Sequence, residues 1–303
     1  MTEPLVVEVT RNGFVESVHH GAVVVLDPSA SVVRAWGDVD APMFPRSSLK
    51  PLQTLALLDA GWSPTDAEFV ALAAASHSGE PRHVDVVRRM LRAAGLDETA
   101  LDNTPDWPLD PVAARGCPAP DRLHQNCSGK HAAMLATCAT AGWPTAGYRD
   151  PAHPLQVAVR AGIERSCEER VAAVAVDGCG APLFAISLAG LARGFVSLRG
   201  TAVASAMRSH PDLVGGTDRD VTGLMTAVPG LVAKDGAEGV YAAMTAAGGA
   251  VAVKVHDGAA RARLPLLLHG LELLGVAVDP LRDLVPPVLG HGEPVGTVRL
   301  PAG

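Results

Sequence analysis

Hydrophobic residues follow a strand-like pattern at both ends of the chain and a helical spacing in the middle. Near the amino end, β-branched and alternating runs predict strands over residues 5–10, 22–26 and 32–36. Another strand is expected at residues 250–255, followed by a leucine-rich helix over residues 264–274. Strands at both ends predict one antiparallel sheet that the two terminal segments form together.

Between these ends the pattern is mostly helical. Leucines recur every three residues from Leu49 to Leu58, so a helix is expected to begin at Ser47, with Pro51 tolerated in its first turn. Residues 102–126, rich in proline and aspartate, are expected to form a long functional loop. Further helices are predicted over residues 66–75, 83–94, 130–141, 155–168, 183–192, 202–209 and 219–228.

These elements predict an α+β protein in which helices flank an antiparallel sheet and a mostly helical lobe is inserted. We expect a single catalytic unit, residues 1–303, made of two interleaved lobes. The sheet lobe is expected at about residues 1–60 and 235–303, and the helical lobe at about residues 61–234. The 48% of hydrophobic residues supply ample material for a core.

Composition excludes several classes of function. The chain has 25 Lys and Arg against 32 Asp and Glu, only 4% aromatic residues and no basic stripe, so nucleic-acid binding is not expected. No apolar run approaches the roughly 20 residues that cross a bilayer, and no signal peptide is recognisable. Five scattered cysteines suit reduced thiols. We expect a cytoplasmic protein without a membrane partner.

The strongest chemical pattern is a Ser-x-x-Lys motif formed by Ser47 and Lys50 at the expected helix start. Three residues apart on a helix, the two side chains share a face, so the amine can take the proton of the hydroxyl. The amine must be neutral to do so, which burial or a second nearby cation favours. A helix cap followed by a solvated lysine is the alternative.

Serine β-lactamases and penicillin-binding proteins also begin a helix with Ser-x-x-Lys, and they add a second serine and a lysine on a late strand. The candidates here are Ser76 and Lys254. A lysine in an apolar strand is costly unless its head group reaches a partner, although an edge-strand lysine that prevents aggregation is the alternative. Strict Ser-Asp-Asn and Lys-Thr-Gly motifs are absent from the sequence, so a standard penicillin-recognising enzyme is not expected.

Two glycine-flanked cysteines form another group. Cys127 stands in NCSGKH, residues 126–131, and Cys179 in DGCG, residues 177–180. Such positions favour the thiolate that nucleophiles and metal ligands need, whereas most free cysteines are small buried hydrophobes. Without a Cys-x-x-Cys or His-x-x-x-His spacing, these residues alone do not establish a zinc site.

Four segments resemble the signature blocks of the Rhizobium etli-type L-asparaginases, the class 3 or asparaginase II family. They are FPRSSLKP at residues 44–51, SHSGE at residues 76–80 with His83, NCSGKH at residues 126–131 and DGCGAP at residues 177–182. The blocks stand in the family's order, and the resemblance runs from about residue 5 to the end. It implies a serine β-lactamase-like fold and hydrolysis of L-asparagine to L-aspartate and ammonia.

The resemblance implies two serine and lysine couples, Ser47 with Lys50 and Ser76 with Lys254. Ser47 would attack the amide carbon, and Lys50 would accept the proton and pass it to the departing ammonia. Ser76 and Lys254 would assist Lys50 and relay protons. Ser76 as the nucleophile is the alternative that the residues leave open.

The resemblance also implies one zinc ion per chain, Zn²⁺, held by Cys127, Cys179 and the amine of Lys130. An amine binds zinc only when it has lost its proton, so the alternative is that charged Lys130 meets the substrate carboxylate. We also expect a homodimer.

The substrate is a zwitterion, so its carboxylate needs a cation and its amine an anion. The candidates are Arg46 and Asp177, respectively, with His131 and Glu80 as outer contacts. For each of them a surface charge or a loop cap is the alternative. Another serine amidase on the same scaffold, such as a glutaminase or D-aminopeptidase, or a non-catalytic amino-acid-binding protein, is the alternative function.

Overall fold

The structure is a computed structural model that describes residues 2–301, so residues 1, 302 and 303 of the expected unit lie outside it. Its contacts divide the chain into two compact units. Unit 1 consists of Met1–Ser48, Ile186–Ser197 and Gly223–Gly303, and unit 2 of Leu49–Ala185 and Leu198–Thr222. The lobes expected from the sequence had boundaries near residues 60 and 235, and they did not include the middle segment that unit 1 takes.

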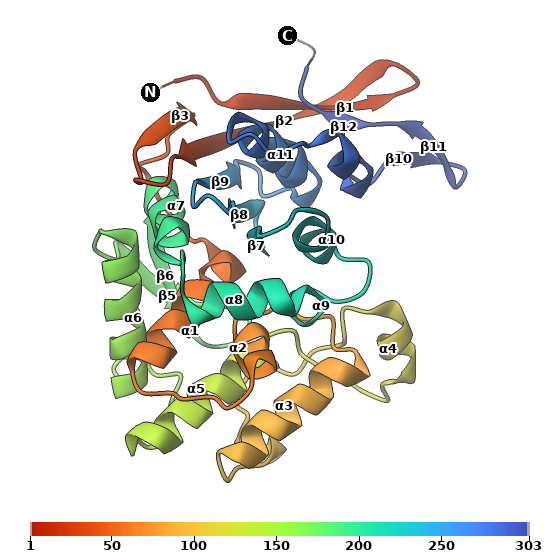
Figure 1. Ribbon diagram of the computed structural model, residues 1–303. Helices are drawn as coiled ribbons and strands as arrows, with labels where there is room; N and C mark the ends of the chain where they lie inside the picture. The colour runs from red at the N-terminus through yellow and green to blue at the C-terminus, as the bar shows by residue number, and fades with distance from the viewer. Residues whose placement is uncertain (1, 302–303) are drawn as a thin grey trace. The chain divides into compact units, whose positions relative to one another are not determined.

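Unit 1 is built on an antiparallel sheet to which both ends of the chain contribute. Its strands are β1 (Leu5–Arg11), β2 (Phe14–Leu26), β3 (Val32–Trp36), β7 (Val232–Asp235), β8 (Val240–Met244), β9 (Ala250–Val255) and β12 (Val298–Arg299). They follow the order β12-β1-β2-β9-β8-β7, and β3 pairs with β2. Figure 1 shows the red amino-terminal and blue carboxyl-terminal strands side by side. The predicted α+β class with a shared antiparallel sheet is confirmed.

Two helices of unit 1 pack on β2 and β9, namely α7 and α11. Val23 and Val25 of β2 lie opposite Val253 and Val251 of β9, and all four side chains are fully buried. Branched side chains suit this pleated, covered surface, which joins the two ends of the chain. The remaining elements of unit 1 are β4 (Pro42–Met43), η1 (Arg46–Leu49, ending in unit 2), α7 (Leu188–Ser197), α10 (Asp220–Ala227, beginning in unit 2), η3 (Ala260–Ala262), α11 (Arg263–Leu273), η4 (Asp279–Leu284), β10 (Val288–Gly290) and β11 (Glu293–Gly296).

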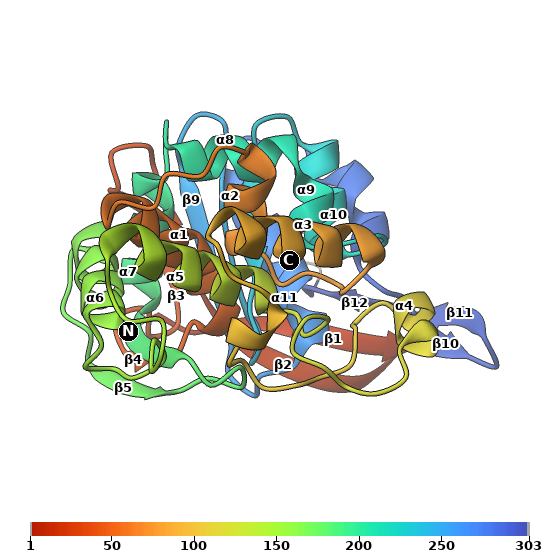
Figure 2. The same ribbon diagram turned by 90° about the horizontal axis from the view of Figure 1, so that it is seen from below.

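Unit 2 is mostly helical. Its elements are α1 (Lys50–Asp59), α2 (Ala67–Ala73), α3 (Pro81–Ala93), η2 (Glu98–Ala100), α4 (Pro111–Gly116), α5 (Ser128–Ala141), α6 (Pro154–Cys167), β5 (Ala173–Val176), β6 (Pro182–Ser187, ending in unit 1), α8 (Ala202–Ser209) and α9 (Pro211–Val214). Helix α5 packs against α1, α2 and α3, and Figure 2 shows α3 beside it. Every α5 residue through Cys138 is buried, so Lys130 and His131 on this helix need partners inside the protein.

Most predicted elements are found, and the exceptions have local causes. The strand predicted at residues 22–26 extends back to Phe14 as β2. The helix predicted over residues 183–192 is wrong in its first half, which is β6, because the run LFAI is apolar throughout and gives no period. The short strands β7 (VAKD) and β8 (VYAAM) were missed, since Ala, Lys and Asp have low strand propensity. The expected loop at residues 102–126 contains the short α4.

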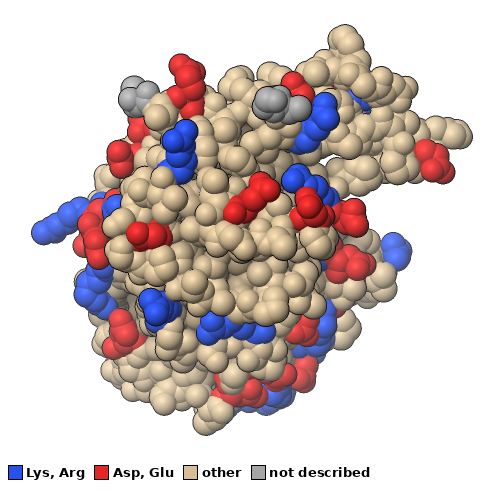
Figure 3. Space-filling view, turned by 45° about the horizontal axis from the view of Figure 1, so that its top comes forward, with Lys and Arg blue, Asp and Glu red and all other residues tan. Residues whose placement is uncertain are grey.

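The surface in Figure 3 carries both signs of charge. Acidic and basic side chains are interspersed on that face, and neither gathers into a large patch. Within residues 2–301, no helix combines the length and the hydrophobicity that a bilayer-spanning segment requires.

Candidate functional site

Lys50 and Ser76 lie in contact inside unit 2. Lys50 begins α1 and is only 1% exposed. Its Nζ donates to Ser76 Oγ at 3.0 Å, and to the carbonyl oxygens of Ala75 at 2.5 Å and Asn126 at 3.5 Å. An ammonium group has three N–H donors, so these uncharged acceptors use all of them. The amine and the Ser76 hydroxyl are therefore within proton-transfer distance.

Asn126 connects this pair to the cysteine motif. Its main-chain oxygen accepts from Lys50, while its side-chain oxygen lies 3.1 Å from Cys127 Sγ and accepts from Gln125 Nε2 at 2.9 Å. Asn126 was not among the predicted site residues. Its position directly before Cys127 in the NCSGKH segment was the signal available.

Cys127, Lys130 and Cys179 form a buried cluster at the amino end of α5. Lys130 Nζ lies 3.3 Å from Cys179 Sγ. A hydrogen bond from Cys127, and then the charge of Lys130, lower the pKa of the Cys179 thiol to about 5 although burial opposes this. The same hydrogen bond raises the pKa of Cys127 to about 12. Cys179 is thus the thiolate of the pair and Cys127 the thiol.

The charge state of Lys130 follows from the same contacts. Burial lowers its pKa, but the negative charges of the Cys179 thiolate and then the Asp177 carboxylate help to outweigh burial, and the pKa is raised above its ordinary value. Cys179 Sγ also lies 3.8 Å from an Asp177 carboxylate oxygen. Lys130 is therefore an ammonium ion held by a thiolate and a nearby carboxylate.

The donor set of this cluster fits zinc. Zinc bonds of 2.0–2.3 Å place neighbouring tetrahedral ligands about 3.5 Å apart, close to the 3.3 Å between Lys130 Nζ and Cys179 Sγ. One thiolate is already present. Binding through all three residues would displace protons from Cys127 and Lys130, as metal binding commonly does.

An ion pair outside the cluster holds the Cys179 turn. Gly180 has a φ of +86°, and a Cβ there would lie 2.4 Å from Arg149 Nη1. Arg149 Nη1 donates to the Gly180 carbonyl oxygen at 3.1 Å, and its Nε donates to Asp102 at 2.8 Å. Glycine is therefore needed where the arginine holds the turn. Sequence patterns gave no signal for this contact between distant residues.

His131, a predicted outer contact of the substrate, is fully buried. Its Nδ1 lies 2.7 Å from the Tyr148 hydroxyl, which accepts from the Asp102 N–H at 3.1 Å. The other ring nitrogen, Nε2, is a buried atom with no hydrogen-bond partner among the described residues. Burial, then the charge of Lys130, keep the pKa of His131 well below its ordinary value.

Glu80 caps a helix. It precedes α3, and its N–H donates to the Nδ1 atom of His83 at 3.1 Å. Its carboxylate accepts from the Thr217 N–H at 2.7 Å and pairs with Arg82 at 2.9 Å. These contacts are those of a loop cap, and a substrate contact of Glu80 stays a prediction.

In unit 1, the serine turn lies against the end of β7. Ser48 Oγ donates to the Lys234 carbonyl oxygen at 3.2 Å. A Cβ at Gly236 would lie 2.7 Å from the Pro45 carbonyl oxygen and 2.8 Å from Ser48 Oγ, so only glycine permits this approach. The segment Lys234 to Gly236 is therefore packed beside the turn that carries Ser47.

Lys234 is a candidate that the sequence analysis missed. It is fully buried, and its Nζ pairs with an Asp235 carboxylate oxygen at 2.6 Å. Arg263 lies 3.5 Å from the other Asp235 oxygen and donates to the Gly236 carbonyl oxygen at 3.0 Å. The signal was Lys-Asp-Gly on a strand, which differs from Lys-Thr-Gly only in its middle residue.

Lys254, the predicted partner of Ser76, has other contacts within unit 1. Its Nζ donates to the carbonyl oxygens of Glu238 at 2.5 Å and Val255 at 2.8 Å, and burial lowers its pKa. The hydrogen bond of Ser76 is to Lys50 instead. The Ser76–Lys254 couple stays a prediction. Arg46, expected to bind the substrate carboxylate, lies 3.9 Å from a Glu238 carboxylate oxygen.

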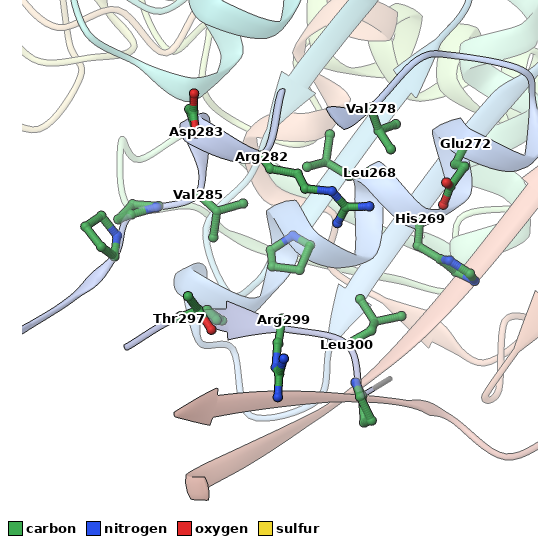
Figure 4. Close-up of a pocket in the computed structure, with 15 residues that line it drawn as sticks. Leu268, His269, Glu272, Val278, Arg282, Asp283, Val285, Thr297, Arg299 and Leu300 are labelled. Atoms are coloured by element: carbon green, nitrogen blue, oxygen red, sulfur yellow. The ribbon is translucent and has the colours of Figure 1, made fainter. Parts of the chain in front are cut away.

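A cavity of about 760 Å³ in unit 1 is not part of this chemistry. It is lined by α11, η4, β12 and the segments beside them (Figure 4). Its ionisable lining residues are His269, Glu272, Arg282, Asp283 and Arg299. None of the predicted serine, lysine or cysteine residues lines this cavity.

Comparison with known proteins places the chain in a family. A search of curated proteins gives no matching sequence. Among solved structures, the chain is similar to the crystal structure of a β-lactamase from Mycobacterium bovis, with 15% identity and a TM-score of 0.40 over 88% of this chain and 95% of that chain. The family model described as L-asparaginase II matches residues 7–300. Because this match covers nearly the whole chain, the protein belongs to the L-asparaginase II family.

Proposed function

We propose that the protein is an L-asparaginase that hydrolyses the side-chain amide of L-asparagine. Membership of the L-asparaginase II family supports an amidohydrolase. The observation that carries the mechanism is the buried Lys50 amine, 3.0 Å from the Ser76 hydroxyl, with only uncharged hydrogen-bond acceptors. A lysine whose charge no carboxylate holds is suited to accept a proton.

Ser47, three residues before Lys50, is the proposed nucleophile. Its oxygen attacks the amide carbon while its proton passes to Lys50, with Ser76 as the relay that the hydrogen bond to Lys50 provides. Collapse of the tetrahedral intermediate breaks the carbon–nitrogen bond, and Lys50 returns the proton to the departing ammonia. Water, deprotonated by Lys50, then attacks the acyl ester, and Lys50 gives that proton to the departing Ser47 oxygen as aspartate is released.

Ser76 as the nucleophile is the second candidate within this mechanism. The observation in its favour is that Ser76, rather than Ser47, accepts the hydrogen bond of Lys50. Against it stands its burial, since only 4% of the residue is exposed. Trapping the acyl ester and locating it by peptide mass spectrometry distinguishes the two serines.

The charged ends of the substrate require opposite partners. Asp177 remains the proposed contact of the α-amine and Arg46 the proposed contact of the α-carboxylate. Lys234 and Arg263 both lie beside the Asp235 carboxylate, so this part of unit 1 carries two cations. Lys234, which stands in a Lys-Asp-Gly sequence on a strand, is a further candidate for the carboxylate and for the second lysine of the mechanism.

Zinc, if bound, would be held by Cys127, Lys130 and Cys179, where it would supply positive charge that orients a substrate carboxylate or carbonyl. The steps above do not depend on it. The proposed homodimer and cytoplasmic location rest on the sequence alone, and light scattering tests the first.

Ammonia release under multiple turnover is the test of the function. The purified chain is expected to release one ammonia per L-asparagine, more efficiently than from L-glutamine or D-amino acid amides. The Ser47→Ala variant, folded by circular dichroism, is the control. A wild-type chain that binds asparagine without releasing ammonia, or that prefers another amide, would contradict the proposal.

A further inference from the structure

A second group of metal-ligand side chains lies in unit 2, apart from the cluster of Cys127. Cys117 follows α4, the yellow helix labelled in Figure 2, and Asp121 and His124 follow it in the same loop. One donor atom from each of the three lies within 4.8 Å of the other two. This group brings together a sulfur, an oxygen and a nitrogen donor.

The distances resemble those around a tetrahedral ion. Cys117 Sγ lies 3.8 Å from Asp121 Oδ2 and 3.9 Å from His124 Nδ1. Ligands at zinc bond lengths stand roughly 3.3–3.8 Å apart. The third pair, His124 Nδ1 and Asp121 Oδ2, is a 2.7 Å hydrogen bond, which would lengthen by less than about 1 Å when an ion replaced the shared proton.

Hydrogen bonds within the loop hold these residues in place. The main chains of Asp106 and Asp121 exchange two hydrogen bonds, at 3.1 and 3.2 Å. The other carboxylate oxygen of Asp121 accepts from the His124 N–H at 2.7 Å, which leaves Oδ2 turned to the imidazole. Ligands that are already positioned lose little conformational entropy on binding.

An open side of the group faces a cavity. Cys117 and His124 line a cavity of about 580 Å³, together with Glu80 and Thr217, whereas Asp121 is not among its lining residues. An ion held by the three side chains would have Asp121 behind it and the cavity in front. A fourth coordination position would then be accessible to water or to a small ligand.

We propose that Cys117, Asp121 and His124 form a zinc site of three protein ligands, separate from Cys127, Lys130 and Cys179. The mixed thiolate, imidazole and carboxylate set favours zinc over magnesium or calcium, which prefer oxygen ligands. Three protein ligands with one open position resemble a ligand-binding zinc site more than a closed structural one. The site does not depend on the proposed asparaginase activity.

Cobalt substitution tests the site in isolation. A Cys127→Ser/Cys179→Ser chain is loaded with Co²⁺ and then titrated with zinc, so that Cys117 supplies the thiolate-to-cobalt absorption. We expect one equivalent of metal and a charge-transfer band. Adding Cys117→Ser is expected to remove the band and weaken zinc binding by about a hundredfold or more, since even outer-shell changes cost 10–100-fold. Adding Cys138→Ser, a buried thiol of α5, is the control and should change neither.

The wild-type chain provides a second measurement that does not need the double variant to fold. Native mass spectrometry of zinc-loaded protein should show one zinc fewer in both Cys117→Ser and His124→Gln than in wild type and in Cys138→Ser. Equal zinc content and an unchanged cobalt band in Cys117→Ser would overturn the proposal. Because the readout is metal content, a chain that releases no ammonia leaves this test intact.

Discussion

Lys50 of unit 2 and Lys234 of unit 1 are both lysines with almost no exposed surface, yet their head groups meet different partners. The Lys50 amine donates to two main-chain carbonyls and the Ser76 hydroxyl. The Lys234 amine is paired with the Asp235 carboxylate at 2.6 Å, and Arg263 approaches the same carboxylate. One buried charge is compensated by an opposite charge and the other is not.

This difference indicates different roles for two chemically identical side chains. A carboxylate stabilises the charged form of a lysine, so Lys234 is suited to act as a fixed cation. A lysine whose acceptors are uncharged pays the desolvation cost of its charge without a Coulombic gain, which suits a group that must lose and regain a proton. Burial alone therefore does not distinguish the two lysines, whereas the charge of the groups around each amine does.

Replacing Lys50 should have the largest effect. Lys50→Met keeps the length of the side chain but removes the amine, and we expect kcat/KM for asparagine to fall by about a thousandfold or more, within or above the range of general base catalysis. Steady-state ammonia release measures this.

Lys50→Arg is the matched control for charge. It keeps a buried cation near Ser76 but cannot accept a proton at neutral pH. We expect it to be as inactive as Lys50→Met. Substantial activity in Lys50→Arg would show that the charge matters rather than proton acceptance, and Lys50 would no longer differ in role from Lys234.

Replacing Lys234 should lower the stability of the protein more than replacing Lys50. Lys234→Met removes the cation 2.6 Å from the buried Asp235 carboxylate, so the free energy of unfolding is expected to fall by about 3 kcal/mol, as when a buried pair loses one partner. Lys50→Met leaves no unpaired charge and should cost about 1–2 kcal/mol for its orphaned acceptors. Urea unfolding of both variants gives the comparison. Equal losses in the free energy of unfolding would mean that the two amines contribute equally to stability.

The contrast between these lysines also shows what a sequence can and cannot reveal. Ser47, Lys50 and Ser76 were predicted because they stand in short motifs, whose spacing is visible without a structure. The strand that carries Lys234 was missed, because Ala, Lys and Asp are rare in strands and burial on both faces leaves no alternation. Lys254 was predicted because its valine-rich strand was recognisable.

Contacts between residues distant in sequence could not be predicted for a different reason. Arg149 holds the Gly180 turn through an ion pair with Asp102, 47 residues away. No periodicity links such residues, since their proximity arises only from helix packing and loop closure. The sequence likewise predicted a functional loop at residues 102–126 but not that Cys117, Asp121 and His124 would meet within it.

The burial of His77 near Lys50 predicts that the protein loses stability in acid. His77 is fully buried, its Nδ1 accepts from the Gly79 N–H at 3.2 Å, and its Nε2 lies 2.9 Å from Ser128 Oγ, an arrangement that suits the neutral ring. Burial, then the charges of His83 and Lys50, lower the pKa of His77 well below 6.5. Below pH 6.5 the unfolded chain binds a proton that the folded chain excludes, so stability is complete above that pH and falls as the pH decreases.

The expected loss is up to about 1.4 kcal/mol per pH unit for each such histidine. Urea unfolding between pH 7 and pH 5 measures it. His77→Gln, which cannot titrate, should show a shallower pH dependence than wild type, whereas His256→Gln, at an exposed position, should match wild type. Identical slopes for all three proteins would mean that His77 becomes protonated in the folded state.

Replacing Lys254 should have the smallest effect and completes the comparison with a half-buried lysine. Its amine donates to two main-chain carbonyls, and burial lowers its pKa although the charges of Glu238 and Asp257 oppose this. Lys254→Met does not remove the Lys50 amine that contacts Ser76, and it does not break a buried ion pair. We expect a loss of less than about 1 kcal/mol in stability, as for most partly exposed polar contacts, and kcat/KM within about threefold of wild type. A Lys254→Met protein that is as stable as wild type but loses as much activity as Lys50→Met would support the Ser76–Lys254 couple predicted from the sequence. The charge of a lysine's partners would then not be the criterion that separates the two buried lysines.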